Sequence, residues 1–91
     1  MIDNIQYMQE EALKAIIHER EYQNNKWGST SSQGLHSNLE FLAYIRDYVE
    51  EAMHVCSRNA DASARDFTQD SLRKIAALAV AAMEQNGVRY R

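Results

Sequence analysis

The chain has no proline and only three glycines among its 91 residues, so few positions interrupt a helix. Its single cysteine, Cys56, cannot form an intramolecular disulfide, and no Cys/His cluster has the spacing of a structural zinc site. A chain of this length buries little more than ~60% of its unfolded surface. Because neither a disulfide nor a metal supports so small a core, we expect the chain to assemble with itself as a homodimer or higher oligomer.

Long apolar runs and a dominant charge are also missing. No segment approaches the ~18 apolar residues of a membrane span, and the N-terminal sequence MIDNIQYMQEEALK lacks the basic start and apolar stretch of a signal peptide. The net charge of −3 comes from interspersed acids and bases, which argues against general nucleic-acid binding. These absences predict a cytoplasmic protein without a membrane span. They leave room for a nucleotide held by a few local groups.

What remains is a pattern typical of an all-α protein. Apolar periodicity and capping signals predict one domain with three helices over about 4–23, 38–56 and 68–86. The second helix begins with a capping box from Ser37 to Glu40, and the third begins after Asp66 or Thr68 and ends at Gly87. Residues 24–36 form a loop and 57–66 a connection. The predicted buried stripes are Ile5, Met8, Ala12, Leu13, Ile16 and Ile17; Leu39, Leu42, Ile45, Val49, Ala52, Met53 and Cys56; and Leu72, Ile75, Ala76, Ala79, Val80 and Met83.

The junction of the first helix with the loop carries the first candidate site. Glu19 and Gln23 lie four residues apart and share a helix face, as do Arg20 and Gln23 three apart. Trp27 offers a surface on which a base can stack, and Arg20 or Lys26 offers a positive charge for a phosphate. The alternative interpretation is a helix end closed by an aromatic side chain.

Acidic side chains on the second helix make the second candidate. Asp47 and Glu51 are one turn apart, with Glu50 beside them, and carboxylates at this spacing can share a Mg²⁺. A solvated helix face is the more frequent reason for such a pattern. Arg73 and Lys74 near the start of the third helix could meet a phosphate or these carboxylates, although surface ion pairs of small energetic value are the better explanation.

Several segments, taken in order, resemble a known family. They are ERxxQxxKWG at 19–28, the loop histidine His36, LEFLxYIxxY at 39–48 and LRKIAALAVAAME at 72–84. Together they resemble the small MazG-like proteins of bacteriophages and prophages, which are related to all-α NTP pyrophosphohydrolases. The resemblance implies helices paired across a dimer or tetramer interface. It also implies a Mg²⁺ held by an E-x-x-E cluster on one helix and E-x-x-D on the next, where an activated water releases pyrophosphate.

The metal ligands implied by the resemblance are only partly present. The first motif falls on 47–51, where Asp47 and Glu51 supply acids and Tyr48 does not. The second falls on 71–74, which contains no carboxylate, and Lys74 there would repel Mg²⁺. We therefore favour a non-catalytic accessory protein that binds a nucleotide or a host protein, including a component of host defence. The predicted ligand contacts are Arg20, Gln23, Lys26, Trp27, His36 and Lys74.

The alternative is a Mg²⁺-dependent nucleoside triphosphate pyrophosphohydrolase with a rearranged site. In that hypothesis Asp47, Glu50 and Glu51 hold the metal, with Glu19 as a further candidate ligand, and Glu51 is the candidate catalytic residue.

Overall fold

Three helices make up the described part of the chain. The computed structural model describes residues 4–27, 35–58 and 61–91, and of Trp27 only the backbone. The helices are α1 (Asn4–Trp27), α3 (Asn38–Arg58) and α4 (Ala62–Asn86), and the described ranges contain no strand. The predicted all-α class is confirmed. None of the three helices combines the length and the apolar character of a membrane span within the described residues.

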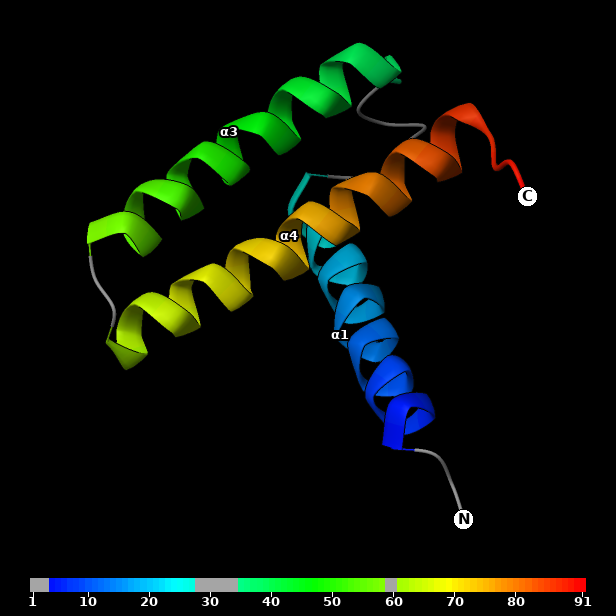
Figure 1. The fold of residues 1–91 in the computed structure, drawn as a ribbon. Coiled ribbons are helices and arrows are strands. Elements are labelled where there is room, and N and C mark those ends of the chain that lie inside the picture. Colours follow the sequence, from blue (N-terminus) through cyan, green and yellow to red (C-terminus); the bar gives the residue numbers. More distant parts are fainter. Residues whose placement is uncertain (1–3, 28–34, 59–60) are drawn as a thin grey trace.

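The helices form a hairpin with an arm (Figure 1). α3 and α4 run antiparallel side by side, while α1 meets α4 near its middle and projects away from the pair, carrying the N-terminus outward. α1 contacts α4, and α4 contacts α3. The small core of the hairpin consists of Phe41, Leu78 and Ala81, with Ile45, Tyr48 and Ala82 packed against it.

The start of α3 agrees with its predicted capping box. The Ser37 hydroxyl accepts the Glu40 amide N–H at 3.1 Å, and the Glu40 carboxylate accepts the Ser37 amide N–H at 2.9 Å. Each side chain thus satisfies a backbone donor that the first helical turn leaves unpaired. Gly87 ends α4 as predicted, with a φ of 104° that favours glycine and an amide bonded to the Met83 carbonyl at 3.0 Å.

The predicted start of the third helix was wrong. α4 begins at Ala62, because the Asp61 carboxylate accepts the Ala64 amide at 3.0 Å and caps the helix six residues before the predicted start. Thr68 lies inside the helix, where its hydroxyl donates to the Arg65 carbonyl. Asp66 and Thr68 are therefore not caps, and much of the predicted 57–66 connection is helical.

The predicted 24–36 loop begins later than expected, since α1 continues to Trp27. Side-chain pairs one turn apart support this last turn: Arg20 donates to Asn24, and Lys26 lies over the Tyr22 ring. Residues 28–34 of the predicted loop lie outside the described residues.

The predicted buried stripes were mostly wrong as a description of this core. Most of their large members are exposed, and Cys56 is exposed as well. Ile16, Ile45, Ile75 and Val80 are half-buried, and Ile45 packs against the core as predicted. Met8 is 58% exposed on α1, Met53 66% on α3 and Leu72 58% on α4. Neighbouring faces of the same helices make the intramolecular contacts, as the core residue Phe41 shows beside exposed Leu42. A periodic stripe marks a face suited to burial, but it does not identify what covers that face.

Candidate functional site

Charged side chains hold α1 against α4. The Arg20 guanidinium forms a bidentate pair with the Glu84 carboxylate, at 2.6 Å from Nη2 and 3.2 Å from Nε. It also donates to Gln23 and Asn24, each at 3.1 Å. Glu19, Arg20 and Gln23 are all buried, whereas the Glu84 side chain is about half exposed. Arg20 therefore clamps two helices together with most of its N–H groups.

A second ion pair joins the same helices through the preceding residue of α1. The Arg73 Nε lies 2.8 Å from the Glu19 carboxylate, and Arg73 Nη1 lies 2.7 Å from Asp70. These two carboxylates, Glu19 above all, raise the pKa of Arg73. Arg73 thus meets acids here, but its partners are Glu19 and Asp70 rather than the acids of α3.

A fully buried alanine lies between the two pairs along α4. Positions 73, 77 and 84 follow one side of a helix, because they are separated by four and seven residues. Ala77 has no exposed surface. An alanine takes little space at this position, which is compatible with a close approach of another helix beside the two charged pairs. The crossing is therefore built from a small residue between two ion pairs.

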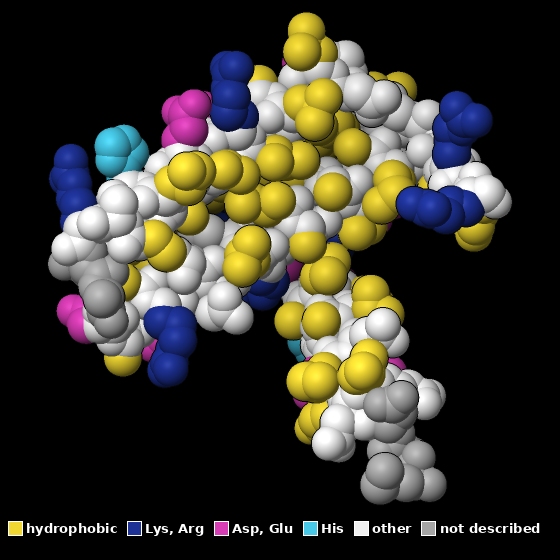
Figure 2. Space-filling model, viewed as in Figure 1, with side chains coloured by type: hydrophobic (Ala, Val, Ile, Leu, Met, Phe, Trp, Pro, Cys, Tyr) yellow, Lys and Arg dark blue, Asp and Glu magenta, His cyan; other side chains and the backbone are white. Residues whose placement is uncertain are grey.

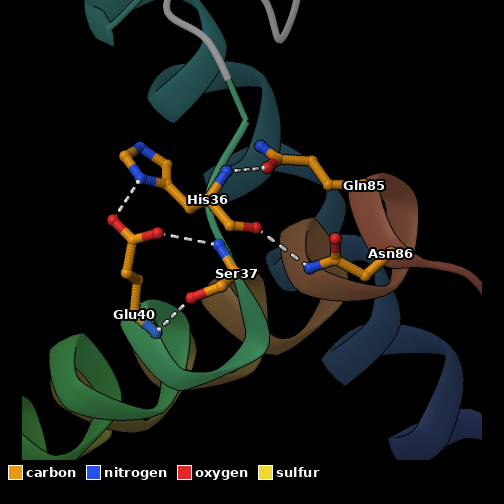
Figure 3. Close-up of polar contacts among 5 residues, drawn as sticks. All are labelled: His36, Ser37, Glu40, Gln85 and Asn86. Atoms are coloured by element: carbon orange, nitrogen blue, oxygen red, sulfur yellow. Dashed lines mark hydrogen bonds and ion pairs between the residues drawn. The ribbon is translucent and has the colours of Figure 1, made fainter.

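The start of α3 is tied to the end of α4 through the backbone of His36 (Figure 3). The His36 amide donates to the Gln85 side chain at 2.8 Å, and the Asn86 side chain donates to the His36 carbonyl at 3.1 Å. Asn86 also donates to Asn38. Because Glu84, Gln85 and Asn86 are consecutive, the final turn of α4 contacts both the ion-paired arginine of α1 and the segment that enters α3.

The His36 imidazole packs among aromatic rings and contacts one acid. It lies edge-on to Phe41 and Tyr44, with centroids 5.7 and 5.8 Å away, and its Nδ1 is 3.3 Å from the Glu40 carboxylate. The pKa of Glu40 is lowered, first by the Ser37 backbone N–H and then by the hydrogen bond to His36. The ring therefore has structural partners within the chain.

The acids predicted to hold Mg²⁺ lie on the exposed surface of α3. Asp47, Glu50 and Glu51 are all exposed. Among the described residues, no group of three His, Cys, Asp or Glu side chains is placed to hold a metal ion. On α4, buried Ser71 donates to the Phe67 carbonyl, and Lys74 lies 5.9 Å from the centre of the Tyr48 ring. The corresponding segment of α4 thus brings no carboxylate to these acids.

The residues predicted to contact a ligand are only partly brought together. Arg20 and Gln23 share the α1–α4 crossing, His36 lies at the adjoining corner, and Lys74 contacts Tyr48 on α3. Lys26 is exposed near the end of α1, and the Trp27 side chain lies outside the described residues.

The partners of Arg20 and His36 on α4, namely Glu84, Gln85 and Asn86, were not among the predicted site residues. The available signal was the polar run Glu84-Gln85-Asn86 directly before the helix-ending Gly87. Such a run at a helix end can serve the neighbouring segments as readily as solvent.

Comparison of the chain with protein-family models, with curated proteins and with solved structures finds no match. The case for a function therefore depends on the residues and on their geometry.

Proposed function

We propose that this chain is a non-catalytic, self-associating binding protein on a scaffold like that of the MazG-like proteins. The proposal rests mainly on the α4 segment 71–74, whose side chains supply no metal ligand. Ser71 is buried and bonded to its own helix, Arg73 is paired with Glu19 and Asp70, and Lys74 contacts an aromatic ring. None of these side chains is an oxygen donor free to complete a Mg²⁺ site with the acids of α3.

The exposed surface favours a protein as the binding partner. Large apolar side chains are exposed on all three helices, and such surfaces mark protein interaction sites when they are contiguous. The predicted phosphate contact Arg20 is engaged instead, since a phosphate would have to displace Glu84 from its guanidinium. Besides other copies of the chain, we propose a host protein as the partner. A component of host defence is the class to test first, in keeping with the resemblance to phage proteins.

Release of pyrophosphate tests the non-catalytic part directly. The protein is incubated with Mg²⁺ and a mixture of canonical nucleoside triphosphates, and pyrophosphate is measured for the wild type, Asp47→Ala and Glu51→Ala. Glu21→Ala, an exposed acid of α1, is the matched control. We expect no release above background from any of them. Release that falls in Asp47→Ala and Glu51→Ala but persists in Glu21→Ala would establish the pyrophosphohydrolase instead.

Two binding measurements test the choice of partner. Affinity capture from a host lysate should retain a protein that a charge-matched helical control does not retain. Calorimetry with nucleotides should show no heat of binding. A nucleotide that binds, with affinity lost in Arg20→Met, would move the function to the nucleotide-binding hypothesis.

A further inference from the structure

We propose that the exposed apolar stripes of α1, α3 and α4 form the interface through which copies of this chain assemble. The inference rests on the self-association proposed above and does not depend on whether the protein is catalytic. It names the surface involved and the occupant, which is a second copy of the chain.

α3 carries two apolar faces, and its contact with α4 uses one of them. Phe41, Ile45 and Tyr48 point into the hairpin core. A second face, turned by roughly a quarter of the circumference, contains Leu42, Val49 and Met53, at spacings of seven and four residues. Leu42 is 60% exposed and Met53 66%. A helix with one covered and one open apolar face has a second surface suited to burial against another element.

α4 and α1 also carry exposed apolar side chains. On α4, Leu72 and Met83 are exposed and follow one side of the helix, away from the buried Leu78. On α1, Ile5 and Met8 are exposed along the projecting arm. Figure 2 shows apolar side chains gathered over the α3–α4 hairpin and continuing along the arm on the same side of the molecule. The three stripes therefore contribute to one apolar side.

The surface area of the chain exceeds that of a compact monomer by an amount fit for a stable interface. The chain exposes 7334 Å², whereas a compact protein of 10.5 kDa exposes about 5,400 Å². The excess of about 1,900 Å² is larger than the roughly 800 Å² per partner of a standard interface and falls within the obligate homodimer range. The radius of gyration agrees, at 14.9 Å against about 12 Å for a compact chain of this length.

The small core argues that the occupant is another copy. No large side chain is fully buried among the described residues. Most of α1 before Glu19 is exposed, and an isolated helix of such length is marginal in water. The surface must therefore be covered whenever the chain is folded. A second copy is always present when the protein is made, and the mild net charge of −3 does not oppose its approach.

Two substitutions on the stripes, each with a control at the adjacent residue, test the interface. Met8→Glu and Met53→Glu place a carboxylate on the stripes of α1 and α3. Tyr7→Glu and His54→Glu place it on adjacent exposed positions that a helix turns away from the stripes. Tyr7 is 59% exposed and Met8 58%, so Tyr7→Glu is a control for Met8→Glu that is matched in exposure as well as in position. Molar mass by light scattering, sedimentation equilibrium and helical circular dichroism are measured for the wild type and all four variants.

We expect the wild type to have at least twice the 10.5 kDa mass of one chain, with a melting temperature that rises with protein concentration. Met8→Glu and Met53→Glu should weaken assembly by about a hundredfold or more, because each would bury an unpaired carboxylate. Tyr7→Glu and His54→Glu should retain the wild-type mass. Loss of helicity together with dissociation in the stripe variants alone also supports the inference, since it shows that folding needs the covered surface.

Two results would overturn the proposed interface. The first would leave self-association intact, and the second would exclude it as well. If the wild type assembles but all four variants keep its mass, the interface lies elsewhere while self-association stands. If the wild type is a folded monomer with a concentration-independent melting temperature, both the interface and the proposed self-association fail. Neither result bears on pyrophosphate release, which tests catalysis separately.

Discussion

The two helix contacts of this chain differ in their chemistry, since one is apolar and the other is charged. α3 and α4 meet through Phe41, Leu78 and their apolar neighbours, with no ion pair among these core residues. α1 and α4 meet through two ion pairs, Arg20 with Glu84 and Glu19 with Arg73. The first contact resembles a conventional hydrophobic core, whereas the second places charged groups at the crossing point.

The two contacts should therefore respond differently to salt and to single substitutions. Apolar burial is non-directional and is not weakened by charge screening, while an ion pair depends on geometry, solvent exposure and ionic strength. Removing one partner of a buried pair leaves an uncompensated charge, so the α1–α4 crossing is vulnerable to single substitutions. The hairpin is therefore expected to retain its structure under changes that release the arm.

The largest effect is expected at the apolar contact. Phe41→Ala removes the main aromatic side chain of the hairpin core, where Phe41 is 4% exposed. Such truncations cost about 3–5 kcal/mol, a large part of the stability of so small a domain. Urea unfolding should show most of the cooperative transition lost. Tyr90→Ala, at a 92% exposed position, should leave the transition in place; equal effects of the two variants would show that the α3–α4 core does not dominate.

A smaller and more local effect is expected at the charged contact. Arg20→Met removes the guanidinium but keeps much of the apolar stem, and it leaves Glu84 without its partner. Since the Glu84 side chain is 47% exposed and can be hydrated, we expect a loss of about 2 kcal/mol, below the usual cost of breaking a fully buried pair. Hydrogen exchange should accelerate in α1 more than in α3.

The control for this comparison is Arg46→Met, which changes an exposed arginine of α3. It should leave exchange in α1 unchanged. If Arg20→Met instead accelerates exchange equally in α1, α3 and α4, the arm and the hairpin open as one unit and the comparison between the contacts fails.

The corner between the two contacts should be the next most sensitive. Ser37→Ala removes the hydroxyl that accepts the Glu40 amide at the start of α3. Loss of an N-cap typically costs about 1 kcal/mol. Ser57→Ala is a matched control, because the Ser57 hydroxyl only donates to a carbonyl of its own helix at the other end of α3. A fall in the urea midpoint for Ser37→Ala that Ser57→Ala reproduces would contradict a specific capping role.

How far the sequence predicted this fold differs between helix ends and helix faces. The Ser37–Glu40 box and Gly87 were predictable because capping depends on residues three or four apart. Asp61 was missed because Asp66 and Thr68 are equally suitable N-cap residues by type. The choice between the three is settled only by where the helix begins in the structure. The α3 stripe with Leu42 and Met53 was identified as apolar, but periodicity cannot tell an intramolecular core from a surface left for another chain.

The candidate site was predictable only in its α1 half. Arg20 and Gln23 were selected because their spacing places them on one face, and they do lie together. Their partner Glu84 is sixty-four positions away from Arg20, and Arg73 is similarly distant from Glu19, so no local pattern links them. The absence of acids from segment 71–74 could be read from the sequence. The ion pair between Arg73 and Glu19 could not, because it depends on how α1 crosses α4.

The smallest expected effect is a dependence of stability on acid at the Glu40 corner. The pKa of Glu40 is lowered in the folded chain by the Ser37 backbone N–H and by His36. A carboxyl group whose pKa is lower in the folded state stabilises that state above its unfolded pKa of about 4.3. This stabilisation is lost as the pH falls through the folded pKa. Glu40→Gln should therefore be less stable than the wild type near neutrality, and the difference should shrink below about pH 4.

Asp61 provides an internal comparison at the other end of the hairpin. Its pKa is also lowered, chiefly by the Ala64 amide, but no histidine contributes. Melting temperatures of the wild type, Glu40→Gln and Asp61→Asn are compared from neutral pH down to about pH 3, a range that passes through the usual pKa values of both carboxyl groups. Both variants should have flatter profiles than the wild type at the acidic end. A Glu40→Gln profile parallel to that of the wild type would show that the interactions at Glu40 do not stabilise the fold, because linkage requires the profiles to converge where the carboxyl group is protonated in both states.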